Sequence, residues 1–181
     1  MPCNSEVLMS RLLAIVVAAT FVFATSSSAE ARIVPKKSIA GIRIGVKRAK
    51  VIERLGQPSS IDTCPGCGAG PGVRNGKLLR YKHKKIEVLL IRRRVAEIST
   101  TSWHQRTAAG IGRGSKRARV EAKYGQCHGG GSYQCFLGKT PENDGDRYTG
   151  VLFNQHNRVV RVAVGRFDAD ADEFCYLFGC G

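Results

Sequence analysis

The cysteines of this 181-residue chain could form disulfides, act in redox chemistry or bind a metal ion. Six follow residue 31: Cys64, Cys67, Cys127, Cys135, Cys175 and Cys180. An even number in an exported chain indicates disulfides, and six cysteines allow 15 pairings. We predict pairing between neighbours, Cys64–Cys67, Cys127–Cys135 and Cys175–Cys180, because each pair lies within one loop or tail. The second pair closes a loop that contains Gly129, Gly130 and Gly131.

The first pair allows a second interpretation, because Cys64-Pro65-Gly66-Cys67 has the C-x-x-C spacing of thiol–disulfide oxidoreductases. Those enzymes place the pair at the N-terminus of a helix, whereas no helical pattern follows Cys67 here. A structural disulfide is therefore favoured, and an exported oxidoreductase is the alternative function. Cys127 and Cys135 are too far apart in sequence for a zinc ribbon, so we expect no metal site and no cofactor.

Two short runs of cations could bind an anionic partner. They are Lys82, His83, Lys84 and Lys85, and then Arg92, Arg93 and Arg94. The chain carries 29 Lys and Arg against 14 Asp and Glu, a formal charge of +15, which favours anionic partners. The two runs flank one predicted strand of six residues and would lie about 20 Å apart. The alternative is a solvated charged surface that keeps the protein soluble.

Trp103 is the only tryptophan and could be an interface anchor, although a core position is the commoner role. The sequence shows no Ser/His/Asp grouping, phosphate loop or carboxylate pair. Asp168, Asp170 and Asp172 begin like a calcium loop, but Glu173 stands where glycine is needed. We therefore predict no catalytic residue and no enzyme.

The first 31 residues have the pattern of a secretory signal peptide. Arg11 precedes an apolar run over 12–24, and small residues over 25–31 offer cleavage after Ala29 or Ala31. We predict a secreted or cell-envelope protein without a membrane span after cleavage; an uncleaved anchor is the alternative. Export argues against nucleic acid as the partner.

A sequence repeat organises the rest of the chain. Residues 40–58 and 109–127 match at 10 of 19 positions with a constant offset of 69 residues. In the first copy, Val46, Ala49, Ile52 and Leu55 form one apolar stripe of a helix that Gly56 ends. In the second copy, Ser115 is the predicted N-cap.

Strand-forming runs follow both predicted helices. They cover residues 78–81, 86–91 and 95–101, and then 148–153 and 158–164, with predicted loops over 62–76 and 127–147. Val160, Val162 and Val164 alternate with Arg161 and Ala163, which predicts a sheet with one solvated face. The pattern therefore predicts a helix, a loop and an antiparallel meander in each unit.

Gly45, Val51, Leu55, Gly56, Gln57 and Pro58 form a pattern that resembles the helical motif of the SmpA/OmlA small outer-membrane lipoprotein domain. Two such units in tandem on an exported chain are similar to the β-lactamase inhibitory protein family, over about residues 38–166. The resemblance implies helices on antiparallel sheets, a concave binding face and binding without catalysis. Lys47 and Lys116 depart from it, since a Thr cap is usual there. We take from the resemblance the fold and a binding role, and not the β-lactamase target.

These patterns predict an α+β fold of two tandem units, each with short helices packed on an antiparallel β-meander. The expected divisions are a signal peptide (1–31), unit 1 (32–103), unit 2 (104–167) and an acidic, disulfide-tied tail (168–181). The expected function is non-enzymatic binding of a protein or an anionic envelope polymer through the two basic runs and Trp103. The sequence does not indicate an oligomeric state.

Overall fold

The computed structural model describes residues 32–64, 76–127 and 133–167. The predicted signal peptide, the acidic tail, Cys67, Cys175 and Cys180 lie outside these residues. The elements are β1 (Ile33–Val34), β2 (Ser38–Ile39), β3 (Ile42–Arg43), α1 (Arg48–Leu55), β4 (Ser60–Cys64), β5 (Gly76–Tyr81), β6 (Ile86–Ile91), β7 (Arg94–Thr100), α2 (Arg117–Tyr124), β8 (Gln134–Phe136), β9 (Arg147–Phe153) and β10 (Val159–Arg166).

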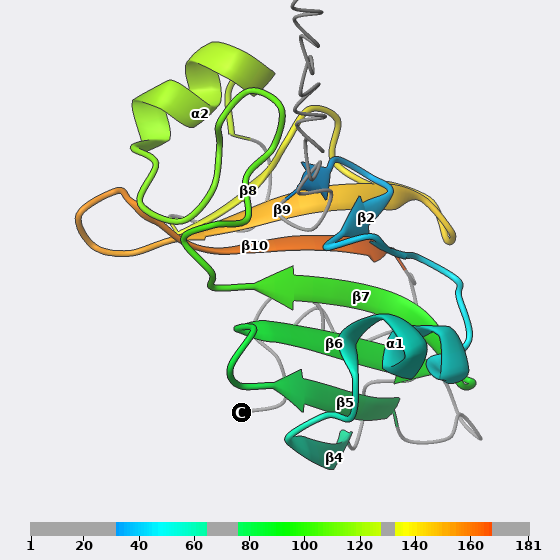
Figure 1. Cartoon of the computed structure of the whole chain (residues 1–181). Coiled ribbons are helices and arrows are strands. Elements are labelled where there is room, and N and C mark those ends of the chain that lie inside the picture. Colours follow the sequence, from blue (N-terminus) through cyan, green and yellow to red (C-terminus); the bar gives the residue numbers. More distant parts are fainter. Residues whose placement is uncertain (1–31, 65–75, 128–132, 168–181) are drawn as a thin grey trace, which may run out of the picture.

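The strands form two antiparallel sheets (Figure 1). The larger has seven strands in the order β4-β5-β6-β7-β10-β9-β8, and the smaller has the order β1-β2-β3. Strands β4 to β7 form one meander and β8 to β10 another, and each connects neighbours in the sequence. The junction is the β7–β10 pair, in which Val162 lies opposite Thr100 and Val164 opposite Ile98.

The prediction of an α+β fold with two tandem units of helices on separate meanders is wrong. Strand is the main secondary structure of the described residues, and the two helices have only eight residues each. The physical reason lies at β7, the last strand of the first meander. An unpaired β7 would expose a row of backbone N–H and C=O groups, and pairing with β10 satisfies them within one continuous sheet.

Both predicted helices are present and begin later than expected. The backbone of Lys47 bridges to Arg94 and that of Lys116 to Arg158, so these residues are extended N-caps. Ser115 is therefore not the N-cap, and its hydroxyl accepts a hydrogen bond from the Gly112 N–H. The predicted strands are also present, whereas β1, β2 and β3 were not predicted, and β4 and β8 fall mostly in predicted loops.

Backbone hydrogen bonds just before each helix attach it to a hairpin of the large sheet. The Gly45 N–H donates to Val95, and the Val95 N–H donates to Val46. In the second copy, the Gly114 N–H donates to Val159, whose own N–H donates to Ser115. Because each helix is only two turns long, these hairpin contacts and not helix propensity hold it in place.

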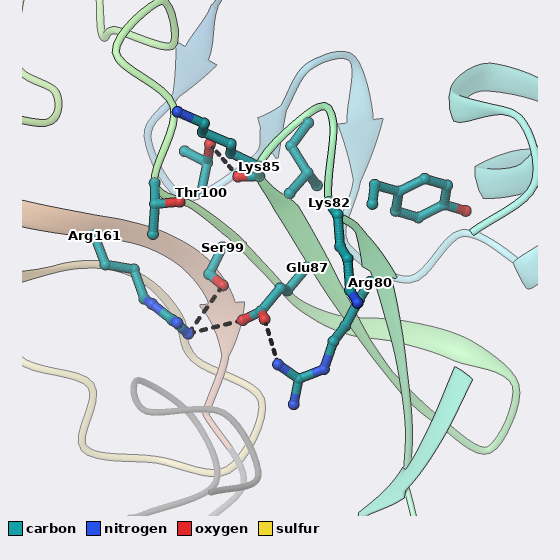
Figure 2. A pocket seen from close by; sticks show the side chains of 10 residues that line it. Arg80, Lys82, Lys85, Glu87, Ser99, Thr100 and Arg161 are labelled. Carbon is teal, nitrogen blue, oxygen red and sulfur yellow. Dashed lines mark hydrogen bonds and ion pairs between the residues drawn. The ribbon is translucent and has the colours of Figure 1, made fainter. Parts of the chain in front are cut away.

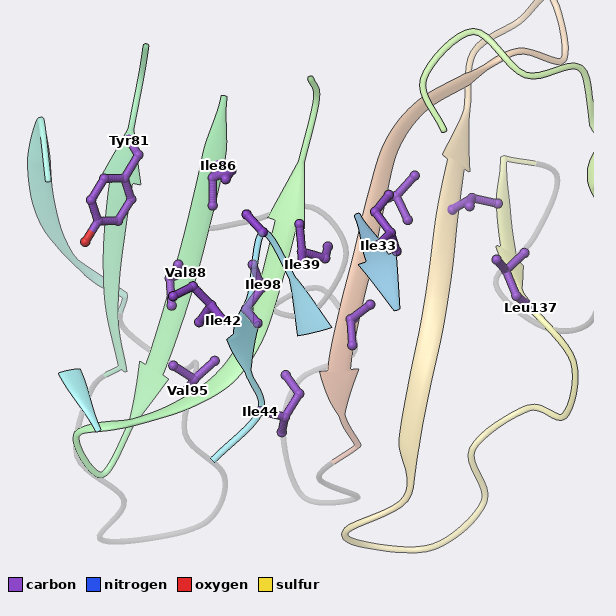
Figure 3. Close-up of a cluster of buried hydrophobic side chains, with 14 of the residues drawn as sticks. Ile33, Ile39, Ile42, Ile44, Tyr81, Ile86, Val88, Val95, Ile98 and Leu137 are labelled. Atoms are coloured by element: carbon purple, nitrogen blue, oxygen red, sulfur yellow. The ribbon is translucent and has the colours of Figure 1, made fainter. Parts of the chain in front are cut away.

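One hydrophobic core lies between the large sheet and the elements that cover it. Figure 3 shows isoleucines of β1, β2 and β3 packed against β6, β7 and the adjacent strands. Val51 and Leu55 of α1 and Val120 of α2 complete this layer.

The opposite face of the sheet is also largely buried, so the predicted solvated face is only partly present. Leu78, Leu89, Tyr148 and Ala163 are buried there, and Arg161 is half-buried. Charged side chains on this face are therefore partly shielded from water, so the attraction within their ion pairs is stronger than at a fully exposed surface.

Candidate functional site: a basic pocket at one end of the sheet

A pocket of about 250 Å³ opens where strands β5, β6, β7 and β10 meet the turn between β5 and β6. Its polar lining consists of Arg80, Lys82, Lys85, Glu87, Ser99, Thr100, Thr101 and Arg161 (Figure 2). Four of these side chains are cationic and one is a carboxylate. The pocket therefore suits an anionic group.

The β5–β6 turn holds two of the cations in place. The Lys85 N–H donates to the Lys82 carbonyl at 3.2 Å, and Lys85 has a φ of 53°. The Lys85 carbonyl accepts hydrogen bonds from the Thr100 hydroxyl at 2.9 Å and from the Thr101 N–H at 3.0 Å. The turn is thus fixed to the end of β7 through its backbone, and both lysine side chains are exposed.

Glu87 bridges the two arginines of the pocket. Its carboxylate oxygens lie 2.9 Å from Arg80 Nη1 and 2.9 Å from Arg161 Nη1. Arg80 also contacts Asp62, with 2.6 Å between Nε and Oδ2. In the part of the chain that the structure describes, no ion pair involves Lys82 or Lys85. The two lysines thus contribute positive charge that no described carboxylate neutralises.

A buried acid lies behind this network. Glu97 on β7 is 4% exposed and accepts a hydrogen bond from the Tyr148 hydroxyl on β9. Burial raises the pKa of Glu97 to about 8, and the Tyr148 hydrogen bond and the Arg161 charge oppose this rise only in part. Glu97 is therefore mainly protonated at neutral pH, while Glu87 at the pocket surface remains paired with two arginines.

The structure separates the predicted binding residues. Lys82 and Lys85 line the pocket, whereas His83 and Lys84 are exposed in the same turn outside its lining. At the opposite end of β6, Arg92 and Arg93 form the turn to β7, and Arg94 is the first residue of β7. Arg92 and Arg93 have φ values of 51° and 63°, as a two-residue type I′ turn requires.

Trp103 is not a core residue, because 51% of its surface is exposed. The guanidinium carbon of Arg113 lies 5.0 Å from the centre of its ring. Trp103 follows β7 two residues after Thr101, which lines the pocket. Arg113 also donates a hydrogen bond to the Thr101 carbonyl, so one side chain contacts both the indole and a residue of the pocket lining.

The described residues include only some of the cysteines for which disulfides were predicted. Cys127 and Cys135 form a disulfide, as predicted. Cys64 is the last residue of β4, and the rest of the C-x-x-C segment lies outside the described residues. Among the described residues, no cluster of three or more His, Cys, Asp or Glu side chains could hold a metal ion.

The sequence did not mark Arg80, Glu87, Ser99, Thr100 and Thr101 as binding residues, and it placed Arg161 only on a solvated face. The available signal was strand alternation, since Arg80, Glu87, Ser99 and Arg161 all point to one face. These side chains meet only because their strands are neighbours in the sheet. The β7–β10 pairing, which brings Arg161 to the others, was not predicted.

Comparisons with known proteins leave the family open. No known family model matches the chain, and no curated protein matches it. The crystal structure of an extracellular protein containing a SCP domain from Bacillus anthracis has a TM-score of 0.48 and 14% identity to this chain. The match covers 70% of this chain and 44% of that chain, so this chain spans less than half of that protein's length. A likeness of this degree assigns neither a family nor an activity.

Neither helix of the described residues has the length and hydropathy needed to cross a membrane.

Proposed function

We propose that this protein is an exported, non-catalytic binding protein whose basic pocket receives an anionic group of a protein or cell-envelope polymer. The observation that carries the proposal is the arrangement of Lys82 and Lys85. Both line a pocket, and in the described chain neither is neutralised by an ion pair.

The internal pairing of the pocket supports binding of an anion at the lysines. Glu87 already neutralises part of the charge of Arg80 and Arg161, and it holds both guanidinium groups in place. An incoming anion can contact the lysines without breaking this bridge. The energetic penalty for separating a partly buried ion pair is thereby avoided.

The disulfide supports export, because such bonds persist mainly in oxidising compartments outside the cytosol. The pattern of residues 1–31 points to the same compartment. Secretion or retention at the cell envelope would bring the basic pocket into contact with anionic polymers.

Binding of polyphosphate chains at several salt concentrations tests the proposal. We compare the wild type with the double variant Lys82→Ala/Lys85→Ala. The turn is held by backbone groups, so the variant should fold normally. We expect affinity for polyphosphate to fall about tenfold and the salt dependence to lose about two counterions, as for phosphate contacts in nucleic acid complexes.

The matched control is Lys37→Ala/Lys123→Ala, which removes the same charge from exposed lysines outside the pocket lining. The control should change the affinity less than twofold. Equal losses in the two double variants would show that polyphosphate responds only to net charge, and would contradict a specific pocket.

A further inference from the structure

Short hydrogen bonds connect the bend that carries Trp103 to the basic pocket. The Ser102 N–H donates to the Thr100 hydroxyl at 3.1 Å, and the His104 N–H donates to the Ser102 hydroxyl at 3.3 Å. Thr100 lines the pocket. The residue before Trp103 is therefore attached directly to a pocket residue, and the residue after it is attached to Ser102.

Arg113 provides a second connection between the indole and the pocket. Its guanidinium lies over the Trp103 ring, and its Nη1 donates to the Thr101 carbonyl at 2.9 Å. Consecutive Cα atoms are 3.8 Å apart, so the Cα atoms of Thr101 and Trp103 are separated by at most about 7.6 Å. Through the Arg113 contacts, the centre of the indole ring lies no more than about 9 Å from the Thr101 carbonyl oxygen, a span that a sugar phosphate can cover.

The backbone beside Trp103 is shaped to the indole. Gly114 has a φ of 84°, and a Cβ atom there would overlap Cζ3 of Trp103. Gly45, the equivalent residue in the first copy, has a φ of 86° and no atom within 4 Å of the same position. The close approach to Trp103 is thus particular to the second copy, and it holds an aromatic side chain that is still half exposed.

The pocket lining also carries hydroxyl groups, from Ser99, Thr100 and Thr101. Cations suit a phosphate or carboxylate, hydroxyls suit a polyhydroxylated ligand, and an exposed indole packs against the apolar C–H face of a sugar ring. Together they fit a sugar ring that carries a negative charge.

A nucleic acid strand fits less well. Binding of single strands stacks successive bases on several aromatic side chains. In the described residues the large exposed aromatics are Trp103 and Tyr133, and Tyr133 precedes the edge strand β8, beyond β10 and β9. The pocket therefore has one aromatic neighbour and not a row of them.

We propose that Trp103 and the basic pocket form one binding site for an anionic saccharide, with the sugar ring on the indole and its phosphate or carboxylate group at Lys82 and Lys85. This inference rests on the proposed function, because it names the ligand class of the same pocket. It adds a role for Trp103 and for the hydroxyl groups of the lining.

The single tryptophan of the chain makes the site directly observable by fluorescence. The probes are glucose 6-phosphate, glucuronate, uncharged glucose, inorganic phosphate and uridine 5′-monophosphate. We expect at least one charged sugar to bind the wild type about fivefold more tightly than inorganic phosphate or glucose. It should also shift the Trp103 emission to shorter wavelengths, since the ligand covers an exposed indole.

Two variants separate the indole from the cations, with binding measured by calorimetry. Trp103→Ala should reduce affinity for the charged sugar to within twofold of that for inorganic phosphate, and leave phosphate affinity unchanged. Trp103→Tyr should retain at least half of the wild-type affinity. Lys82→Ala/Lys85→Ala should weaken charged sugar and phosphate alike.

Three outcomes would overturn the inference. If the charged sugars bind no more tightly than phosphate, or Trp103→Ala weakens phosphate by the same factor, the saccharide site is wrong while the basic pocket stands. If uridine 5′-monophosphate binds most tightly and depends on Trp103, the ring that stacks is a base. If phosphate and charged sugar bind the wild type and the lysine variant equally, the proposed function fails as well.

Discussion

Glu97 shows how a single side chain can make the stability of this fold depend on pH. It is buried on one face of the sheet and accepts a hydrogen bond from Tyr148. Its pKa is raised to about 8 because burial removes water from around the carboxylate. In the unfolded chain the same group titrates near 4.5. Between these two values the folded state holds a proton that the unfolded state releases.

The stability contributed by protonated Glu97 is therefore present at low pH and is lost as pH rises from about 4.5 to about 8. Since one pKa unit corresponds to about 1.4 kcal/mol, the total loss is a few kcal/mol. Glu97→Gln keeps a neutral acceptor for Tyr148, so the variant should lack this decline and exceed the wild type in stability at pH 8.5. Urea unfolding at half-unit steps from pH 5 to pH 9 measures both slopes.

Tyr148→Phe is the control for this titration. The Tyr148 hydrogen bond lowers the pKa of Glu97, so its removal should extend the decline to higher pH. Parallel stability curves for the wild type and Glu97→Gln would show that Glu97 does not titrate as its burial requires.

Nothing in the sequence marks Glu97 as a buried acid. It falls in a strand-forming run whose charged positions indicate a solvated face, and its burial depends on the pairing of β7 with β10. The basic turns, in contrast, could be identified directly, because consecutive lysines or arginines between apolar runs have no place in a core.

At the scale of elements, the two helix–hairpin attachments provide a matched pair of glycines. Gly45→Ala and Gly114→Ala impose the same positive φ on alanine, at a cost of about 1 kcal/mol. Only the second also pushes against Trp103. We expect Gly114→Ala to lower the free energy of unfolding by at least 1 kcal/mol more than Gly45→Ala. Chemical denaturation of the two variants measures the difference.

Tryptophan emission provides a second readout for the same pair. Gly114→Ala should change the wavelength of Trp103 emission, while Gly45→Ala should leave it unchanged. Equal stability losses with unaltered emission in both variants would mean that the backbone at Gly114 does not position the indole.

The β6–β7 turn places arginine where the backbone favours other residues. Arg92 and Arg93 both have positive φ, which Asn-Gly adopts with less strain. Arg92→Asn/Arg93→Gly should therefore raise the free energy of unfolding by about 1 kcal/mol. It should also leave phosphate binding at the pocket within twofold, because the turn is at the other end of β6. Thermal unfolding and phosphate titration check the two parts.

A fall in stability would show that the arginine side chains contribute contacts that outweigh the backbone strain. A large loss of phosphate affinity would place the anion site at this turn and not in the pocket.

The helices and most of the strands were predictable because their signals are local. Val51 and Leu55 recur at helical spacing, and Gly56 ends the helix with a φ of 82°. The strands β1, β2 and β3 have only two residues each, too few for any period to show.

At the scale of the whole molecule, the pairing of β7 with β10 turns two meanders into one sheet over one hydrophobic core. This long-range contact follows from open strand edges and has no counterpart in the local sequence, which is why the fold class was mispredicted. The pocket was unpredictable for the same reason, since Arg161 on β10 reaches Glu87 on β6 only across this junction.

A continuous sheet and core should unfold in one cooperative transition. Scanning calorimetry should therefore give equal calorimetric and van't Hoff enthalpies. Two resolved transitions would indicate that the halves on either side of the β7–β10 pair melt separately.

Titration of the isotope-labelled protein with inorganic phosphate at low salt, followed by NMR, tests the central claim most directly. If an anion binds in the pocket, the largest shifts will fall on Lys82, Lys85 and Thr101 and on the guanidinium group of Arg161. Shifts concentrated at Arg92, Arg93 and Arg94, or spread evenly over all the exposed cations, would contradict it.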